Sequence, residues 1–312
     1  MKTVFLGTPQ FAVPSLRFLA KTRHKPLLVI TQPDRPKGRK LKLSPSEIKT
    51  AAQELEIPVF QPDNVNLPEN LETLEKIAPD VIITVAYGSY LKKKIRNLPR
   101  FGCINLHPSL LPRYRGAAPI NYALFNGEKK TGISIFKINA RMDAGPILWQ
   151  REIDILKDDN YSSLLIKLSH LGAEDLGLVL DNMKEKLQKQ VLQDDSLATY
   201  SRKLDKKDTH INWNNTAENI HNKVRGLAEF PGAVAGFRNR RIKIIETEIL
   251  QKSFTAPGII VDFVKNSGII IASKDKDLLI KKVQPEGKKI MSSSAYDLGA
   301  RILRGERFTN GF

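Results

Sequence analysis

The chain has 312 residues, 41% of them hydrophobic, and this exceeds what one hydrophobic core usually holds, so two globular domains are expected. Scattered Pro and Gly exclude a fibrous or disordered chain, and no apolar run approaches membrane-spanning length. The excess of 50 Lys and Arg over 33 Asp and Glu gives a pI near 9.8 and predicts a polyanionic partner, nucleic acid before others, with a solvated basic surface as the alternative.

The N-terminus and the single cysteine indicate a compartment. The opening MKTVFLGTPQF reaches turn residues after four apolar positions, too soon for a signal peptide. Cys103 has no partner for an internal disulfide and is predicted to be a small core residue without thiol chemistry. We therefore expect a soluble, cytoplasmic protein.

Short apolar runs alternate with helical segments through the first half of the chain. The expected strands are residues 2–6, 26–31, 58–61, 80–86, 102–106, 131–138 and 147–153, and the expected helices are 10–20, 44–56, 71–78 and 161–189. Ser44 is expected to cap the second helix, with Pro45 in its first position and Glu47 reaching back to the cap. This alternation predicts an α/β, Rossmann-like and mostly parallel sheet, with ligands at the carboxyl ends of its strands.

The second half has a different pattern. Residues 190–208 are polar and aperiodic, and we expect a linker there between domains at 1–189 and 209–312. Beyond it come a helix at 217–227 and short apolar runs at 242–246, 258–264, 268–272 and 278–283. Short strands punctuated by Gly and Pro predict a small β-barrel.

The segment GCINLHPSLLPRYRG, residues 102–116, is the richest in chemistry. Asn105 and His107 stand two residues apart at the end of an expected strand, so their side chains share one face. An amide donor beside an imidazole can stabilise an oxyanion and move a proton, as acyl transfer to an amine requires. Taken alone, a single His is more often a structural residue.

Asp143 follows in the segment RMDAG, a polar break between two expected strands. Asp before a Gly turn is commonly turn chemistry alone. A carboxylate on a loop beside His107 would also hold the imidazole in one tautomer and order a proton-carrying water.

The motifs INLHPSLLPRYRGAAPIN and MDAG resemble the folate-dependent formyltransferase family typified by glycinamide ribonucleotide formyltransferase. The resemblance implies a catalytic trio of Asn105, His107 and Asp143. It also implies a folate-binding loop formed by Ser109, Leu110, Leu111 and Pro112. The co-substrate it implies is 10-formyltetrahydrofolate, with no metal.

Further motifs, FLGTPQFAVP, TQPDRPKGRK, VAYGSYL, INW, FPGA and PEGKK, are similar to the methionyl-tRNA formyltransferases within that family. These anchors span nearly the whole chain. They imply a C-terminal OB-like domain that binds tRNA, and transfer of the formyl group to the α-amine of methionyl-initiator tRNA. We expect a monomer that has no membrane partner.

The basic segment TQPDRPKGRKLK, residues 31–42, lies where the family carries a loop that contacts the tRNA acceptor end. Without the resemblance a solvated surface loop would be favoured. With it, Arg39 matches the key arginine, and the neighbouring cations supply attraction to phosphates. The implied tRNA-binding residues are Arg35, Lys37, Arg39, Lys40 and Lys42.

Four alternative functions can be weighed. Residues 7–12, GTPQFA, lack the GxGxxG turn of dinucleotide-dependent oxidoreductases. A non-catalytic RNA-binding module explains the charge but leaves Asn105, His107 and Asp143 without a purpose. Glycinamide ribonucleotide formyltransferase needs no second domain of this size. A sugar-nucleotide formyltransferase is the closest rival, and the basic segment at 31–42 argues against it.

Overall fold

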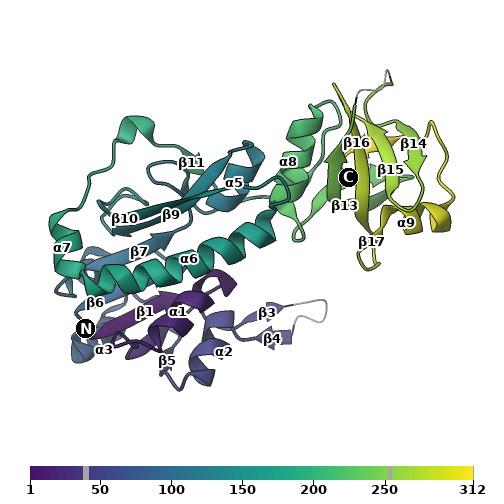
Figure 1. Cartoon of the computed structure of the whole chain (residues 1–312). Coiled ribbons are helices and arrows are strands. Elements are labelled where there is room, and N and C mark those ends of the chain that lie inside the picture. The colour runs from purple at the N-terminus through teal and green to yellow at the C-terminus, as the bar shows by residue number, and fades with distance from the viewer. Residues whose placement is uncertain (38–41, 252–254, 312) are drawn as a thin grey trace. The chain divides into compact units, whose positions relative to one another are not determined.

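The computed structural model describes residues 1–37, 42–251 and 255–311 (Figure 1). These residues form two compact units. Unit 1 comprises residues 1–119, 130–154 and 165–201, and unit 2 comprises 120–129, 155–164 and 202–312, apart from the residues not described. Among the described residues, no helix is both long enough and apolar enough to span a membrane.

Unit 1 is built on a seven-stranded sheet of order β10-β9-β7-β6-β1-β2-β5. Its strands are β1 (Thr3–Gly7), β2 (Leu28–Ile30), β5 (Val59–Phe60), β6 (Val81–Val85), β7 (Cys103–His107), β9 (Lys130–Lys137) and β10 (Ile147–Asp154). The first five strands are parallel to one another, whereas the pairings of β9 with β7 and of β10 with β9 are antiparallel. The predicted mostly parallel, Rossmann-like sheet is confirmed.

Helices cover both faces of this sheet (Figure 1). They are α1 (Val13–Leu19) after a 3-10 turn at Gln10–Ala12, α2 (Glu47–Glu54), α3 (Pro68–Ile77), α4 (Lys93–Asn97), α6 (Tyr161–Asp181) and α7 (Met183–Gln188). Leu74 of α3 and Ile95 of α4 pack into one apolar cluster with alternate strand residues, among them Cys103. Burial raises the pKa of the Cys103 thiol to about 12, in keeping with a core residue.

Helix α6 lies over β7 and α1. A Cβ at Gly172 would come within 2.5 Å of the Leu106 side chain, and one at Gly177 within 2.6 Å of the Phe18 ring. Only glycine allows the helix to approach this closely. The close packing of α6 fixes the strand that ends at His107.

The second helix begins later than predicted. Its N-cap is Ser46, whose hydroxyl accepts a hydrogen bond from Lys49 N at 3.1 Å, so α2 starts at Glu47. Ser44 instead ends strand β4 (Lys42–Ser44). Both serines fit a capping pattern, and the pairing of Ser44 with Arg35 across a hairpin decides between them.

The single helix predicted at 161–189 is two helices. They meet at Asn182, which has φ −115° and ψ 25° and whose side-chain amide donates to Leu178 O at 2.9 Å. An Asn side chain that bonds a carbonyl of the preceding turn competes with the helical backbone pattern. The apolar periodicity continues across the break and therefore did not reveal it.

Part of the predicted basic loop at 31–42 is a hairpin of β3 (Arg35–Lys37) and β4. The base of the hairpin is held by Asp34, which accepts hydrogen bonds from Lys49 Nζ at 2.7 Å and Gln61 Nε2 at 2.8 Å. These two bonds lower the pKa of the Asp34 carboxyl below its ordinary value. Arg39 and Lys40 lie outside the described residues.

The predicted linker at 190–208 begins in unit 1. Val191 bridges Ile147, a 3-10 turn covers Asp195–Leu197, and β11 (Tyr200–Ser201) pairs in parallel with β8 (Arg115–Gly116). Residues 191–201 are called the strap below. A further 3-10 turn, Lys207–Thr209, belongs to unit 2. The division of the chain at 190–208 stays a prediction.

Unit 2 contains an antiparallel sheet of order β14-β15-β16-β13-β12-β18, with β17 paired to β16. Its elements are α8 (Ala217–Leu227), β12 (Ala233–Phe237), β13 (Arg240–Ile249), β14 (Ile260–Val264), β15 (Gly268–Ala272), β16 (Asp277–Pro285), β17 (Met291–Ser292), α9 (Ser293–Ala300) and β18 (Phe308–Asn310). A bridge between Ile259 and Arg307 joins the two ends of this sheet, as the small OB-like barrel requires. Helix α5 (Pro119–Phe125), like α6, contributes residues to both units.

Three aromatic rings pack together within the mainly aliphatic core of the barrel. Phe237 and Phe308 stack with centroids 4.5 Å apart, and Trp213 meets Phe308 edge-on at 5.9 Å. Helix α8 is capped by Thr216, whose hydroxyl accepts from Asn219 N at 3.3 Å. The predicted β-rich C-terminal domain is confirmed, although the sequence analysis missed β12 and β18, which carry two of these three rings.

Candidate active site

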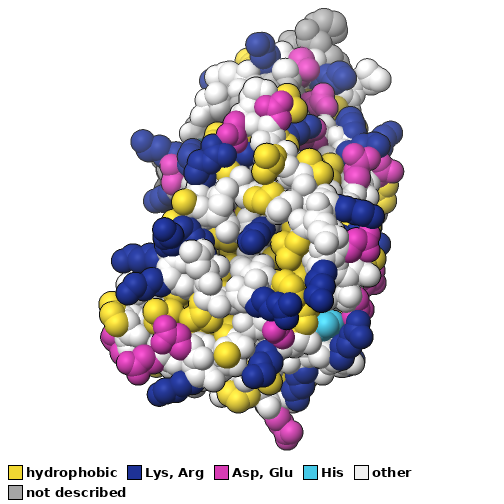
Figure 2. Space-filling model, turned by 90° about the vertical axis from the view of Figure 1, so that its left-hand side faces the viewer, with side chains coloured by type: hydrophobic (Ala, Val, Ile, Leu, Met, Phe, Trp, Pro, Cys, Tyr) yellow, Lys and Arg dark blue, Asp and Glu magenta, His cyan; other side chains and the backbone are white. Residues whose placement is uncertain are grey.

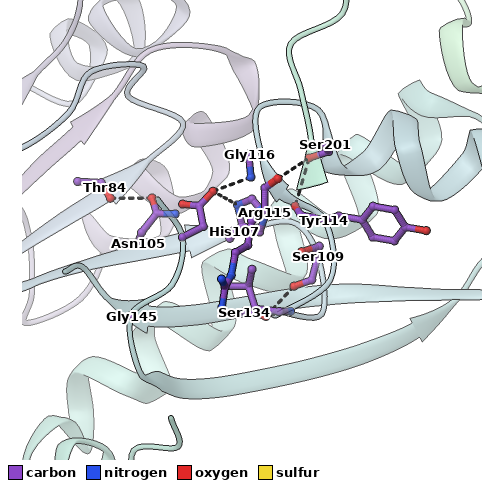
Figure 3. Close-up of polar contacts among 12 residues, drawn as sticks. Thr84, Asn105, His107, Ser109, Tyr114, Arg115, Gly116, Ser134, Gly145 and Ser201 are labelled. Carbon is purple, nitrogen blue, oxygen red and sulfur yellow. Dashed lines mark hydrogen bonds and ion pairs between the residues drawn. The ribbon is translucent and has the colours of Figure 1, made fainter. Parts of the chain in front are cut away.

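Asn105 lies near the end of β7, paired in register with Thr84 of β6. The Thr84 hydroxyl donates to Asn105 Oδ1 at 2.6 Å (Figure 3). With the amide in this orientation its carbonyl oxygen faces the hydroxyl, which also donates to Ile104 O at 3.1 Å. This orientation leaves the N–H donors of Asn105 for another partner.

His107 ends β7 and is 4% exposed. Its Nε2 lies 2.9 Å from Tyr114 O. A main-chain carbonyl only accepts, so Nε2 carries a proton and Nδ1 is the nitrogen that can gain or lose one. Nδ1 faces the Asp143 carboxylate, with 3.8 Å between Nδ1 and Oδ2.

Asp143 stands in the loop between β9 and β10. Its Oδ2 also accepts a hydrogen bond from Gly116 N at 2.8 Å (Figure 3). Its backbone has φ 48°, the left-handed region that costs an L-residue about 1–2 kcal/mol. The separation of 3.8 Å between the carboxylate and His107 Nδ1 exceeds a direct hydrogen bond, while a small movement or a water would link the two groups.

Gly116 must be glycine at this site. It has φ 116°, and a Cβ there would lie 2.5 Å from Ser201 O of β11. A side chain would therefore push β11 away and displace the N–H that binds Asp143. The sequence analysis named neither Gly116 nor Thr84, although a Thr inside the apolar run VIITV is a polar signal of the right kind.

The predicted folate loop is held rigidly. Ser134 Oγ donates to Ser109 O at 2.6 Å and accepts from Leu111 N at 3.0 Å, and Gln150 Nε2 donates to Leu111 O at 2.8 Å. Ser109 and Leu111 are buried, whereas Leu110 and Pro112 are partly exposed. The Ser109 hydroxyl donates to Arg113 O at 2.6 Å and so closes the loop on itself.

Two arginines flank the trio and meet at one carboxylate. Arg115, 2% exposed, donates to Asp195 Oδ1 at 2.9 Å, and Arg141 donates to Asp195 Oδ2 at 2.6 Å. Both bonds lower the pKa of the Asp195 carboxyl below its ordinary value, and the bond from Arg141 is the larger cause. Arg115 is thereby engaged by protein groups.

The remaining predicted site residues are the cations of the basic hairpin. Arg35 is exposed at the start of β3, and Lys37 and Lys42 pair across the hairpin by their backbones. Within residues 1–37, 42–251 and 255–311, no cluster of three or more His, Cys, Asp or Glu could hold a metal ion.

A cavity of about 960 Å³ lies in unit 2 and includes none of the trio. It is lined by both signs of charge along α8, β13 and β16, and its lining includes the ion pairs Lys281–Glu248 and Lys282–Glu246, each at 2.7 Å. We assign the chemistry to unit 1 because a buried His, an oriented amide and a carboxylate come together there.

The trio has the groups that acyl transfer to an amine needs. Asn105 offers N–H donors for an oxyanion, His107 Nδ1 offers a site for a proton, and Asp143 offers a negative charge beside that site. The structure thus brings together the three residues that the sequence analysis predicted as one group, Asn105, His107 and Asp143.

Comparisons with known proteins agree with this chemistry. Residues 1–180 match the family described as formyl transferase, and residues 203–301 match the formyl transferase C-terminal domain. The methionyl-tRNA formyltransferases of Thermodesulfovibrio yellowstonii and Kosmotoga olearia are each 44% identical to the chain. The first match covers 97% of both chains and the second 98% of both.

Solved structures share the fold at low identity. HypX from Aquifex aeolicus in complex with tetrahydrofolic acid has TM-score 0.63 at 16% identity, covering 95% of this chain and 47% of HypX. An N-formyltransferase from Helicobacter canadensis, in complex with folinic acid and dTDP-3-aminofucose, has TM-score 0.66 at 19% identity, covering 90% of this chain and 99% of that one. The family matches and the near-full-length relatives decide the assignment: the chain belongs to the formyl transferase family, alongside the methionyl-tRNA formyltransferases to which it is similar from end to end.

Proposed function

We propose that the chain transfers the formyl group of 10-formyltetrahydrofolate to the α-amine of methionyl-initiator tRNA. The observation that carries the proposal is the convergence of Asn105, His107 and Asp143 at the end of β7. Similarity to methionyl-tRNA formyltransferases over nearly the full length supports the choice of substrate. A cytoplasmic location and a monomeric state complete the proposal.

The reaction begins with attack of the neutral methionyl amine on the formyl carbon. A C–N bond forms and the formyl oxygen becomes an oxyanion, to which the Asn105 N–H donors supply hydrogen bonds. Thr84 keeps these donors facing the substrate, because its hydroxyl occupies the opposite end of the amide. The bond from the formyl carbon to N10 of the folate then breaks.

In net terms the transfer moves one proton from the amine to N10. The amine loses one as it becomes an amide, and N10 gains one as it leaves, so the sum of protons is unchanged. His107 Nδ1 is the group that carries a proton between them, since Nε2 is occupied by Tyr114 O. Asp143 stabilises the imidazolium and, through a water, assists loss of the amine proton.

The loop Ser109, Leu110, Leu111, Pro112 is the proposed folate-binding element. Because the Ser109 hydroxyl and the buried Leu111 side chain are used inside the protein, the partly exposed Leu110 and Pro112 are what the loop offers to a ligand. A loop already fixed by Ser134 and Gln150 loses little entropy on binding.

We propose that five basic residues bind the acceptor end of the tRNA: Arg35, Lys37, Arg39, Lys40 and Lys42. Figure 2 shows Lys and Arg side chains spread over the face it draws, among Asp and Glu. From Ser201 onward the chain has 21 basic and 12 acidic residues, so a share of the positive charge lies in its C-terminal part as well. A polyanion long enough to reach both parts suits this distribution.

The test is a substrate comparison with purified chain and 10-formyltetrahydrofolate. We expect formylation of methionyl-initiator tRNA at a kcat/KM at least about 10-fold above that of methionyl-elongator tRNA, and no formylation of a dTDP-linked amino sugar. The KM for tRNA should rise steeply with salt while the KM for the folate stays nearly constant, because only the former involves many phosphates. Preferential formylation of the amino sugar would overturn the proposal in favour of the sugar-nucleotide class.

A further inference from the structure

The side chain of Gln193 is bound at both ends of its amide. Its Oε1 accepts from Arg115 Nε at 3.0 Å and Nη2 at 2.8 Å, and its Nε2 donates to Asp143 O at 2.9 Å and Gly145 O at 2.7 Å. A guanidinium only donates and a carbonyl only accepts, so these partners settle which end of the amide is which. Gln193 therefore links Arg115 to the loop that carries Asp143.

That loop has little backbone freedom to spare. Asp143 has φ 48°, and a Cβ at Gly145 would lie 1.7 Å from Lys137 O of β9. Asn139 Nδ2 donates to Ala144 O at 3.1 Å, between the two carbonyls that Gln193 holds. Two side-chain amides thus bind three successive carbonyl groups and keep Asp143 in a conformation that L-residues rarely adopt.

The strap, residues 191–201, also supports the Asp143 carboxylate through Gly116. Asp143 Oδ2 accepts from Gly116 N, and Gly116 pairs with Ser201 at the end of the strap. Asp195, which lies between Gln193 and Ser201 in the strap, accepts a hydrogen bond from Arg115. One segment therefore holds both the main chain of Asp143 and the strand that binds its side chain.

We infer that Gln193 is a positioning residue of the transfer reaction, which directs the Asp143 carboxylate toward His107 Nδ1. Its amide does not ionise, and its four recorded bonds all go to Arg115, Asp143 and Gly145, so it acts through the position of Asp143. The 3.8 Å between Asp143 Oδ2 and His107 Nδ1 is a distance that a small shift of the loop would change. The inference rests on the proposed function, because it requires Asp143 to take part in transfer.

Two substitutions separate this role from simple support of the fold. Gln193→Leu removes all four bonds at similar volume, and Gln193→Glu keeps an acceptor for Arg115 while removing the donor to the two carbonyls. Both should lower kcat by about 10-fold or more and leave the KM values for tRNA and folate within about twofold. The control is Gln190→Leu, which changes an exposed glutamine three residues away and should keep parental kinetics.

A double-mutant cycle with Asp143→Asn, in single-turnover assays of methionyl-tRNA formylation, completes the test. If Gln193 acts through Asp143, Gln193→Glu should lower the rate of the parent but change the rate of Asp143→Asn by less than about twofold. The inference would be overturned if Gln193→Glu lowered the rate by the same factor in the parent and in Asp143→Asn. A parental kcat in both Gln193 variants would also overturn it. If Asp143→Asn alone turns over normally, the proposed site fails instead, so the two failures are distinguishable. Thermal melts of every variant show that the rates belong to folded protein.

Discussion

At the scale of single residues, the proposed chemistry depends on which atom of each side chain is already occupied by a neighbouring group. Tyr114 O binds His107 Nε2 and leaves Nδ1 for the proton, and the Thr84 hydroxyl binds Asn105 Oδ1 and leaves the amide donors for the oxyanion. Neighbouring groups therefore assign the roles of the trio before a substrate arrives. In the proposed mechanism, this preorganisation provides electrostatic stabilisation of the transition state.

Thr84→Val tests the orientation of Asn105. The substitution keeps the branched shape inside β6 and removes the hydroxyl that marks the carbonyl end of the amide, so Asn105 gains the freedom to turn over. We expect kcat to fall by about 3- to 10-fold, the value of one neutral hydrogen bond, with folate and tRNA binding unchanged. Thr131→Val, at a buried threonine in β9, is the matched control for the loss of a buried hydroxyl. Equal kcat values for the two variants would mean that Thr84 has no part in orienting Asn105.

Prediction from sequence named the trio that we propose to be catalytic, but it did not name the residues that hold the trio in place. The period-two pattern of a strand put Asn105 and His107 on one face, and the resemblance to formyltransferases added Asp143. The sequence analysis did not identify Gln193, because this residue stands in an aperiodic segment and binds a loop 50 residues earlier in the chain. No local pattern encodes such a contact, since the two residues that it joins are 50 positions apart in the chain.

At the scale of elements, strands were easier to predict than the ends of helices. The alternation of apolar runs gave the main strands of the first sheet, because burial on both faces leaves a continuous hydrophobic signal. Helix starts depended on which of two serines caps, Ser44 or Ser46, and the helix break at Asn182 depended on one side chain. Strand pairing and single hydrogen bonds therefore decide where a helix starts or breaks. The periodic pattern of apolar residues does not reveal these positions.

The packing of α8 against β13 predicts a pH dependence of stability. Burial of His221 is the largest cause that lowers its pKa, and the charge of Arg225 lowers the pKa further. His221 Nδ1 lies 2.9 Å from Thr247 Oγ1. A lowered pKa means that the unfolded chain binds the proton more readily than the folded one. Stability from this group is therefore present above the unfolded value, about 6.5, and is lost as the pH falls through the lowered folded pKa.

His221→Gln should reduce the fall in the free energy of unfolding as the pH is lowered from about 7 to about 5. Denaturant titrations over that range measure it, with His170→Gln on the exposed side of α6 as the control. An unchanged pH slope in His221→Gln would show that His221 is not held neutral by its surroundings.

At the scale of the whole molecule, the formal charge of +17 and the two units fit a large anionic substrate. The proposed catalytic trio and the strap belong to unit 1, whereas unit 2 is a barrel of the kind that often binds nucleic acid. The charge balance could be computed from sequence alone, but the assignment of 120–129 and 155–164 to unit 2 could not, since it depends on contacts between distant segments.

The most direct test of the account is the single-turnover rate of formyl transfer to methionyl-initiator tRNA by Asp143→Asn. The amide has the shape of the carboxylate and keeps an oxygen for Gly116 N, but it has no charge to offer His107. We predict a rate at least about 100-fold below that of the parent, with folate and tRNA affinities within about twofold. A near-parental rate with 10-formyltetrahydrofolate would contradict the account, because the charge facing His107 Nδ1 would then have no part in the transfer.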